Sequence, residues 1–205
     1  MEQAAGGYLS WYRCKYPEPL DLRPKNSFHF QSSRNVDWRQ AFIGELTAVT
    51  RGSPVESLLT DVGINSAQRG LHLAVLVEPY LSFIFEGKKT IESRFSLTRQ
   101  APFKQVKVGD IVVLKRSSGP VCGVCTVGAV WFYELDPASW SEIEKYAQAL
   151  CIDSSEFWEA KRQASFATLM LIENVQALPC FHIPKVDPRG WVVVRPGGPS
   201  QPRLL

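Results

Sequence analysis

The sequence predicts an α+β fold, a small and partly open mixed β-barrel with helices packed on it and a mostly helical N-terminal extension. From residue 71 onward, apolar runs with strand character outnumber helical patterns, and most connections between them permit antiparallel neighbours. Before residue 71 the strand signals are weaker, and two helical patterns take their place. With 205 residues, the chain is long enough for one domain plus an appendage, or for two small domains.

The N-terminal extension is expected to span residues 1–70. Apolar residues recur every three or four positions from Trp38 to Val49, which predicts a helix capped by Asp37. Residues 53–56 form a capping box with proline at its favoured first position, and they predict a second, short helix that stops at Gly63.

An aromatic segment, residues 8–33, precedes these helices. Its aromatic residues stand among three prolines, which is too apolar a composition for a free tail. We expect this segment to lie against the barrel or to bind a protein partner, with residues 8–63 as the surface involved. Residues 64–70 are expected to be a linker.

The barrel is expected at residues 71–195. Strands are predicted at 72–77, 90–95, 110–114, 121–135, 166–175 and 191–195. Residues 117–120 have the chemistry of a hairpin turn, so the strands on either side should pair antiparallel. Helices are predicted at 79–86, 139–150 and 153–163, the last two behind capping boxes that begin at Ser139 and Asp153. Residues 196–205, rich in Pro and Gly, are expected to be a disordered tail.

The composition is that of an ordinary globular chain, with 45% hydrophobic and 21% charged residues. Residues 1–10 carry no basic stretch leading into an apolar run, so no secretory signal is expected there. No apolar segment approaches the roughly 20 residues that a membrane-spanning helix needs. These observations predict an intracellular protein, in the cytoplasm or nucleus, that does not act at a membrane.

The five cysteines do not have the pattern of a disulfide framework, because their number is odd and they are scattered. Cys122 and Cys125 have the spacing of half a zinc site or of a redox motif, but no second cysteine pair or nearby histidine completes a tetrahedral set. Because both stand in an apolar run, we interpret them as structural residues. We expect reduced thiols, no metal and no cofactor.

Residues 87–94, with the sequence GKKTIESR, carry the strongest functional signal. If the chain is extended after position 89, side chains alternate, and Thr90, Glu92 and Arg94 share one face. Lys89 stands at the turn just before this extended segment, and its side chain can reach the same face. Two cations then flank one carboxylate, a cluster that suits an anionic or hydrogen-bonding ligand. The alternative is a surface ion pair between Glu92 and Arg94, worth roughly 0–1 kcal/mol and without functional meaning.

A helix that begins Pro-Tyr and is followed by G-x-K-x-x-E-x-R is formed here by Pro79, Tyr80, Gly87, Lys89, Glu92 and Arg94. This pattern resembles the signature of the activating signal cointegrator homology (ASCH) domain, a member of the PUA-like β-barrel superfamily. The resemblance extends over about residues 71–195. It implies a small PUA-like barrel with a ligand cleft at this cluster.

The resemblance also bears on catalysis. The bacterial acetylcytidine amidohydrolases are similar to this chain at Lys89 and Arg94, but they carry a threonine in place of Glu92, and their catalytic glutamate would align near Leu150. Both differences argue against that activity here. Other ASCH-like proteins are described as ribonucleases, which keeps phosphodiester hydrolysis open, with Lys89 and Arg94 stabilising charge that develops on phosphorus.

Positive charge is concentrated in one window of the sequence. Residues 88–116 hold eight basic and two acidic residues, a net charge of 8 − 2 = +6, whereas residues 117–205 hold seven basic and nine acidic, or −2. If the window folds as strand, loop and strand, these cations can gather on one side and attract phosphates. The alternative is a solvated loop that is basic for solubility.

Three functional hypotheses follow. The first is a nucleic-acid-binding module, with RNA preferred, in which Lys89 holds a phosphate and Tyr80, Trp131 or Trp191 stacks a base. The second is a hydrolase acting on RNA or a modified nucleoside, with Lys89 as nucleophile or base and Glu92 as proton shuttle. The third is an adaptor that docks a protein partner. The expected ligand-binding residues are Tyr80, Lys88, Lys89, Thr90, Glu92 and Arg94.

Histidine chemistry is not expected to contribute. The three histidines, at positions 29, 72 and 182, have no spacing typical of metal ligands or of a Ser/His/Asp triad. His72 stands in an apolar strand, so we interpret it as a core or edge residue and not as a general base.

Overall fold

The computed structural model describes residues 38–61, 69–183 and 187–198. All of them belong to one compact unit, residues 36–205. The predicted cap at Asp37, the aromatic segment 8–33, most of the linker and the tail after residue 198 lie outside the described residues. The division into an extension, a barrel and a tail stays a prediction.

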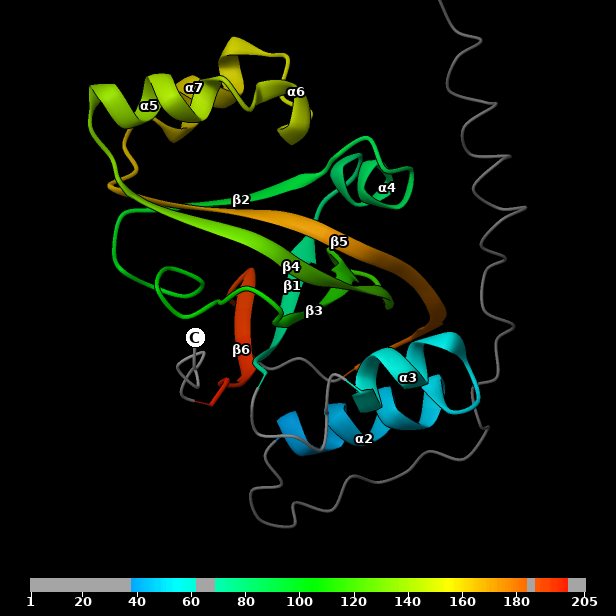
Figure 1. Ribbon diagram of the computed structural model, residues 1–205. Coiled ribbons are helices and arrows are strands. Elements are labelled where there is room, and N and C mark those ends of the chain that lie inside the picture. The colour runs from blue at the N-terminus through cyan, green and yellow to red at the C-terminus, as the bar shows by residue number, and fades with distance from the viewer. Residues whose placement is uncertain (1–37, 62–68, 184–186, 199–205) are drawn as a thin grey trace, which may run out of the picture. The chain divides into compact units, whose positions relative to one another are not determined.

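A six-stranded mixed sheet forms the centre of this unit (Figure 1). Its strands are β1 (Leu71–Leu76), β2 (Ile91–Ser96), β3 (Ile111–Arg116), β4 (Val121–Glu134), β5 (Phe166–Phe181) and β6 (Trp191–Arg195). Their order is β2-β5-β4-β3-β1-β6, with β1 and β3 parallel and every other neighbouring pair antiparallel. The sheet curls so that β1 and β6 cross the direction of β2, β4 and β5, which makes a half-barrel and confirms the predicted fold class.

The predicted hairpin between β3 and β4 is confirmed. The N–H of Arg116 donates to the carbonyl of Pro120 at 2.9 Å, and that of Gly119 donates to the carbonyl of Arg116 at 3.1 Å. Five of the six residues of β3 are buried, as are the first seven of β4. Strands with both faces covered require such continuous apolar runs, which is why the sequence signal was clear.

Strand β5 is longer than predicted, because pairing with β4 continues to Phe181, which lies opposite Val121. The apolar pattern breaks at Glu173 and at Asn174, whose φ is +50°. The register between β4 and β5 shifts at several places, including this region. A bulge of this kind bends the strand without ending it. The polar residues Glu173 and Asn174 therefore stand at a bend in β5 and not at its end.

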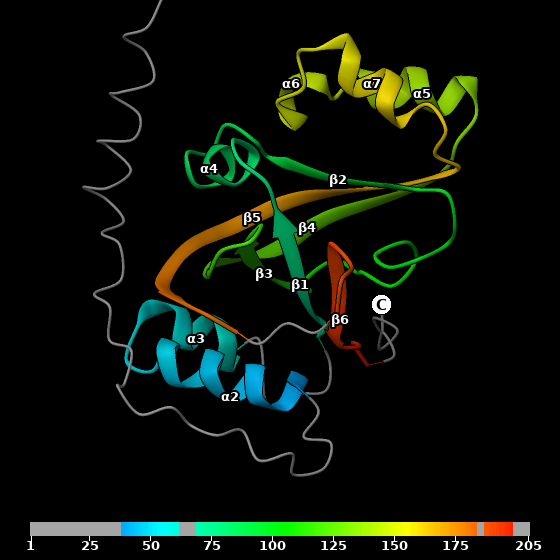
Figure 2. The same ribbon diagram turned by 180° about the vertical axis from the view of Figure 1, so that it is seen from behind.

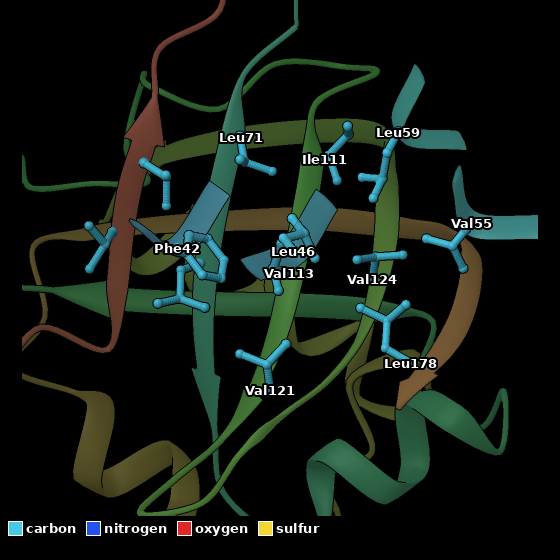
Figure 3. Packing of buried hydrophobic residues seen from close by; sticks show 13 residues of the cluster. Phe42, Leu46, Val55, Leu59, Leu71, Ile111, Val113, Val121, Val124 and Leu178 are labelled. Atoms are coloured by element: carbon cyan, nitrogen blue, oxygen red, sulfur yellow. The ribbon is translucent and has the colours of Figure 1, made fainter. Parts of the chain in front are cut away.

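The two predicted N-terminal helices are present as α2 (Trp38–Thr50) and α3 (Pro54–Asp61). Figure 3 shows their apolar side chains meeting those of β1, β3 and β4 in one cluster. Phe42, Leu46 and Leu59 are at most 2% exposed. Burial of each such side chain contributes about 1.5–3 kcal/mol. Both helices are therefore part of the barrel's own core.

Helix α4 (Tyr80–Phe85) ends as predicted, with Gly87 in the left-handed conformation at φ +71°. The carboxylate of Glu78 accepts hydrogen bonds from the N–H and the hydroxyl of Ser82, at 3.1 and 2.7 Å. This satisfies a backbone donor in the first turn, which has no partner within the helix.

Three helices, α5 (Pro137–Glu144), α6 (Ala147–Leu150) and α7 (Ser155–Lys161), lie together on the opposite side from α2 and α3 (Figure 2). The single helix predicted over 139–150 was wrong, since α5 ends and a new turn begins at α6. The predicted caps were wrong as well. Asp136 caps α5, with Ser139 at the third helical position, and Ser154 caps α7 by accepting from the N–H of Phe157.

The cysteines of the Cys122-Gly-Val-Cys125 segment are buried in the sheet core, at 3% and 1% exposure. This confirms their structural interpretation. Over the described parts of the chain, no group of His, Cys, Asp and Glu has an arrangement suited to a metal ion. No helix among the described residues has the length and apolar character needed to span a membrane.

Candidate functional site

A pocket of about 270 Å³ lies between the free edge of β2, the end of β1, and helices α4 and α7. Lys89, Glu92 and Arg94 line it, together with the aromatic rings of Tyr80 and Phe157. We call it the β2 pocket. The curl of the sheet positions it, because β2 and β1 are far apart in strand order yet face each other here.

Glu92 lies between two cations. Its Oε1 is 2.9 Å from Nε of Arg94, and its Oε2 is 3.6 Å from Nζ of Lys89. The side chains of Glu92 and Lys89 are only 9% and 4% exposed. A carboxylate this buried requires compensation by charge and hydrogen bonds. The alternative of a surface ion pair is therefore wrong, and the predicted arrangement of two cations around one carboxylate is present.

Lys89 is directed inward by the turn that follows α4. After Gly87, the N–H groups of Lys88 and Lys89 both donate to the carbonyl of Phe83, at 2.9 and 3.0 Å. The Nζ of Lys89 donates to the carbonyl of Leu150 at 3.0 Å and lies 5.4 Å from the ring centre of Tyr80. Leu150 thus reaches this lysine through its backbone carbonyl.

Arg94 joins two strands that do not pair. Its Nη2 donates to the carbonyl of Val75 on β1 at 3.0 Å, and its Nη1 donates to the carbonyl of Gly190 at 3.3 Å. The guanidinium also lies over the ring of Trp191, 5.4 Å from its centre. Arg94 therefore closes the gap between β2 and β1 with its side chain, while it remains 21% exposed to the pocket.

Tyr80 and Phe157 form the aromatic wall. Their ring centres are 6.5 Å apart in an edge arrangement. Burial raises the pKa of Tyr80, and the nearby carboxylates of Asp153 and Glu92 and the thiol group of Cys151 raise it further. The phenol consequently stays neutral at physiological pH and can donate a hydrogen bond from its O–H.

Eight residues that line the pocket were not predicted: Val75, Leu76, Val77, Ser93, Phe95, Ile152, Phe157 and Lys161. Ile152, Phe157 and Lys161 come from the α6–α7 region, more than fifty residues beyond the cluster. Phe157 and Lys161 stand four positions apart on one helix face, with Nζ 5.6 Å from the ring centre. The sequence shows this four-residue spacing, but it does not show that the helix lies beside β2. Ser93 lines the pocket although its side chain alternates away from Glu92.

Two predicted site residues do not line the pocket. Lys88 pairs with Glu86 at 2.7 Å and lies over the ring of Phe83, with 63% of its side chain exposed. Thr90 is exposed, and its backbone donates to the carbonyl of Ala149. The predicted wall of Thr90, Glu92 and Arg94 therefore consists of Glu92 and Arg94.

Most other cations of the basic window are engaged one at a time elsewhere. Arg99 pairs with Glu134 at 2.7 Å, and Arg116 pairs with Glu78 at 3.3 Å. Lys115 donates to the carbonyls of residues 116 and 119. Of the window's eight cations, Lys89 and Arg94 line the β2 pocket, and its other cation is Lys161. The basic residues at positions 88–116 therefore do not form a common rim around the β2 pocket.

His72 is a fully buried core residue, as expected. Its Nε2 lies 2.9 Å from Oδ2 of Asp110, and its Nδ1 accepts from Nε1 of Trp191 at 3.2 Å. Burial raises the pKa of Asp110, but hydrogen bonds from His72 and the N–H groups of Gly70 and Lys107 outweigh it and hold the pKa below its ordinary value. This network fixes the indole ring of Trp191, over which the guanidinium of Arg94 lies.

The predicted stacking tryptophans lie outside the β2 pocket. Trp131 packs on Tyr146 with ring centres 5.8 Å apart, and Trp191 is 3% exposed beneath Arg94. Tyr80 lines the pocket as expected, together with the unpredicted Phe157.

The family model of the ASCH domain matches residues 75–176. The chain carries an ASCH domain. The match confirms the resemblance seen at residues 79–94, and it runs from β1 to the middle of β5, which includes the β2 strand and all of its cluster. Helices α2 and α3 and strand β6 lie outside the matched residues.

Solved structures of ASCH domains show limited similarity to this chain. ASCH from Zymomonas mobilis has 16% identity and a TM-score of 0.43, and the match covers 52% of this chain and 69% of that one. The ASCH domain from Lactobacillus crispatus has 15% identity and a TM-score of 0.40, covering 74% of this chain and 99% of that one. A comparison with curated proteins gives no match.

Proposed function

We propose that this ASCH domain binds single-stranded nucleic acid, with RNA preferred, and takes one nucleotide into the β2 pocket. The observation that carries the proposal is the buried carboxylate of Glu92 held between two cations in a pocket with aromatic walls. Sequence-specific RNA recognition commonly uses unpaired bases that stack on aromatic rings and hydrogen-bond through their edges.

The charge of the pocket suits a phosphate. Three positive charges line the pocket, from Lys89, Arg94 and Lys161. Glu92 contributes one negative charge, so the net charge of the site is 3 − 1 = +2. An ammonium group has three N–H donors. Lys89 uses one for the Leu150 carbonyl, and so it keeps donors for a phosphate oxygen.

The walls of the pocket suit a base. Stacking of a base on an aromatic side chain is worth about 1–3 kcal/mol and depends little on base identity. The Tyr80 hydroxyl and the Glu92 carboxylate add groups that can pair with a base edge or a ribose hydroxyl. A purely cationic site would repel the donors of a base, which gives the carboxylate a role in binding.

A hydrolase acting on RNA or on a modified nucleoside is the second candidate. It is favoured by the burial of Lys89 beside Glu92, whose Nζ and Oε2 are 3.6 Å apart, a separation over which one bridging water could pass a proton. Against it stands the absence of a glutamate at Leu150, near which the catalytic glutamate of the bacterial amidohydrolases would align; Lys89 meets only the backbone carbonyl of this residue.

A binding and cleavage assay separates the two candidates. Labelled single-stranded RNA is titrated into the wild-type protein and into Glu92→Gln, and both mixtures are then incubated and analysed for products. Retained binding without any product supports the binding module, whereas cleavage by the wild type that Glu92→Gln abolishes supports the hydrolase. Glu144→Gln on the exposed face of α5 is the matched control. Absence of RNA binding by the wild type would refute the proposal.

A further inference from the structure

A second pocket, of about 240 Å³, adjoins the β2 pocket. It is lined by Ser96, the loop 100–102, Thr168 and the segment 189–191. We call it the Trp191 pocket. Arg94 and Phe95 line both pockets, so the two are neighbours along β2.

The free edge of β2 forms the shared wall. Strand β2 ends the sheet and pairs with β5 on one side. The N–H of Ile172 donates to the carbonyl of Thr90, and in an antiparallel ladder the paired residues alternate. Ser93 and Phe95 therefore direct their backbone N–H and C=O groups to the free edge. From Ser93 to Ser96, three steps of strand span about 10 Å.

Arg94 stands where the two pockets meet. A guanidinium has five N–H groups. One faces Glu92, one donates to the Val75 carbonyl and one to the Gly190 carbonyl. The remaining two, one on each terminal nitrogen, have no acceptor among the described residues. They are placed to donate to an anion that lies between the pockets.

We infer that the Trp191 pocket is a second nucleotide subsite, so that the domain takes at least a dinucleotide, with the linking phosphodiester on Arg94. The inference rests on the proposed function of the β2 pocket. A wall of about 10 Å exceeds the 3.4 Å that one nucleotide of a stacked strand occupies along its axis. Two neighbouring nucleotides therefore fit along it.

The chemistry of the Trp191 pocket suits recognition through a base edge. Trp191 is 3% exposed and held by His72, and so it acts as a rigid wall beneath Arg94. Arg189 is paired with Asp187 at the rim. Gln100 is exposed, and its side-chain amide offers both donors and an acceptor. The Phe95 backbone adds one donor and one acceptor from the free edge.

The test compares probes of different length on wild-type protein and on two charge variants. The probes are uridine and adenosine 5′-monophosphates and the dinucleotides UpU and ApA with a 5′-phosphate, and affinities are measured by calorimetry. Gln100→Glu places a negative charge in the second pocket. Gln105→Glu, an exposed glutamine of the same loop that does not line the pocket, is the matched control.

The wild type should bind each dinucleotide at least ten-fold more tightly than the corresponding mononucleotide. Gln100→Glu should lower dinucleotide affinity at least five-fold and mononucleotide affinity less than two-fold, and Gln105→Glu should change neither. Equal affinity for both lengths, or equal losses for both lengths in Gln100→Glu, overturns the second subsite and leaves the β2 pocket standing. If the wild type binds neither mononucleotides nor dinucleotides, the proposed function itself fails.

Discussion

The Nη2 of Arg94 lies 3.0 Å from the carbonyl oxygen of Val75, and this contact connects β2 to β1 across the opening of the half-barrel. The two strands stand at positions one and five of the sheet and share no ladder. The same side chain holds Glu92 and covers Trp191. One residue of the cluster thus contributes both to barrel closure and to the wall of the pocket.

Arg94→Lys should reduce the free energy of unfolding by about 1–3 kcal/mol, because a lysine cannot reach Glu92 and both carbonyls with one point charge. Urea unfolding monitored by tryptophan fluorescence measures the change. Arg99→Lys is the control, since Arg99 and its partner Glu134 are 62% and 58% exposed and such a pair contributes little. Equal, small effects in both variants would refute a closing role for Arg94.

Tyr80→Ala should lower RNA affinity by about 1–3 kcal/mol through loss of base stacking, whereas Tyr80→Phe should retain most of it. Because the pKa of Tyr80 is raised, its phenol remains neutral between pH 7 and 9 and should cause no change in affinity over that range. Fluorescence anisotropy with labelled single-stranded RNA gives both results. A loss in Tyr80→Phe as large as that in Tyr80→Ala would assign the energy to the hydroxyl.

Lys161→Ala should weaken RNA binding to a similar degree for all sequences and reduce the salt dependence of log K by about one unit, as expected for one lost phosphate contact. Titrations at several salt concentrations provide the slope. Lys145→Ala, an exposed lysine just after α5 that does not line the pocket, should leave the slope unchanged. An unchanged slope in Lys161→Ala would remove this residue from the binding site.

Asp110→Asn should destabilise the protein by about 1–3 kcal/mol at pH 7, because the carboxylate accepts three hydrogen bonds in the core. The pKa of Asp110 is lowered by folding, so its contribution is complete above the unfolded value of about 3.9 and is lost as the pH falls below it. Urea unfolding at pH 7, 5 and 3 should therefore show the difference between the wild type and Asp110→Asn narrowing at pH 3. A constant difference would contradict the lowered pKa. Asp153→Asn on the surface serves as control.

Local signals in the sequence predicted much of the fold. Continuous apolar runs identified the strands other than β2, which was placed by assuming an extended chain after position 89, and Gly87 marked the end of α4. The caps of α5 and α7 were misplaced by one to three residues, because several neighbouring side chains can each cap a helix. In the structure, Asp136 and Ser154 form the capping hydrogen bonds. The sequence alone does not show which of the neighbouring candidates forms them.

Local signals also predicted part of the candidate site. Alternation along a strand correctly placed Glu92 and Arg94 together, and the corner position of Lys89 was correct. Lys88 was included on charge alone, although the nearby Glu86 holds it. The contribution of α7 depends on the curl of the sheet and on packing between segments more than sixty residues apart, which no local pattern encodes.

If the proposed function holds, Lys89, Glu92 and Arg94 form the floor of a nucleotide site. Crystals of the protein soaked with uridine and adenosine 5′-monophosphates show whether they do. We expect a nucleotide in the β2 pocket, with its base against Tyr80 and Phe157 and its phosphate within hydrogen-bond distance of Lys89, Arg94 or Lys161. A β2 pocket that stays empty while the nucleotide occupies another face of the molecule would contradict it.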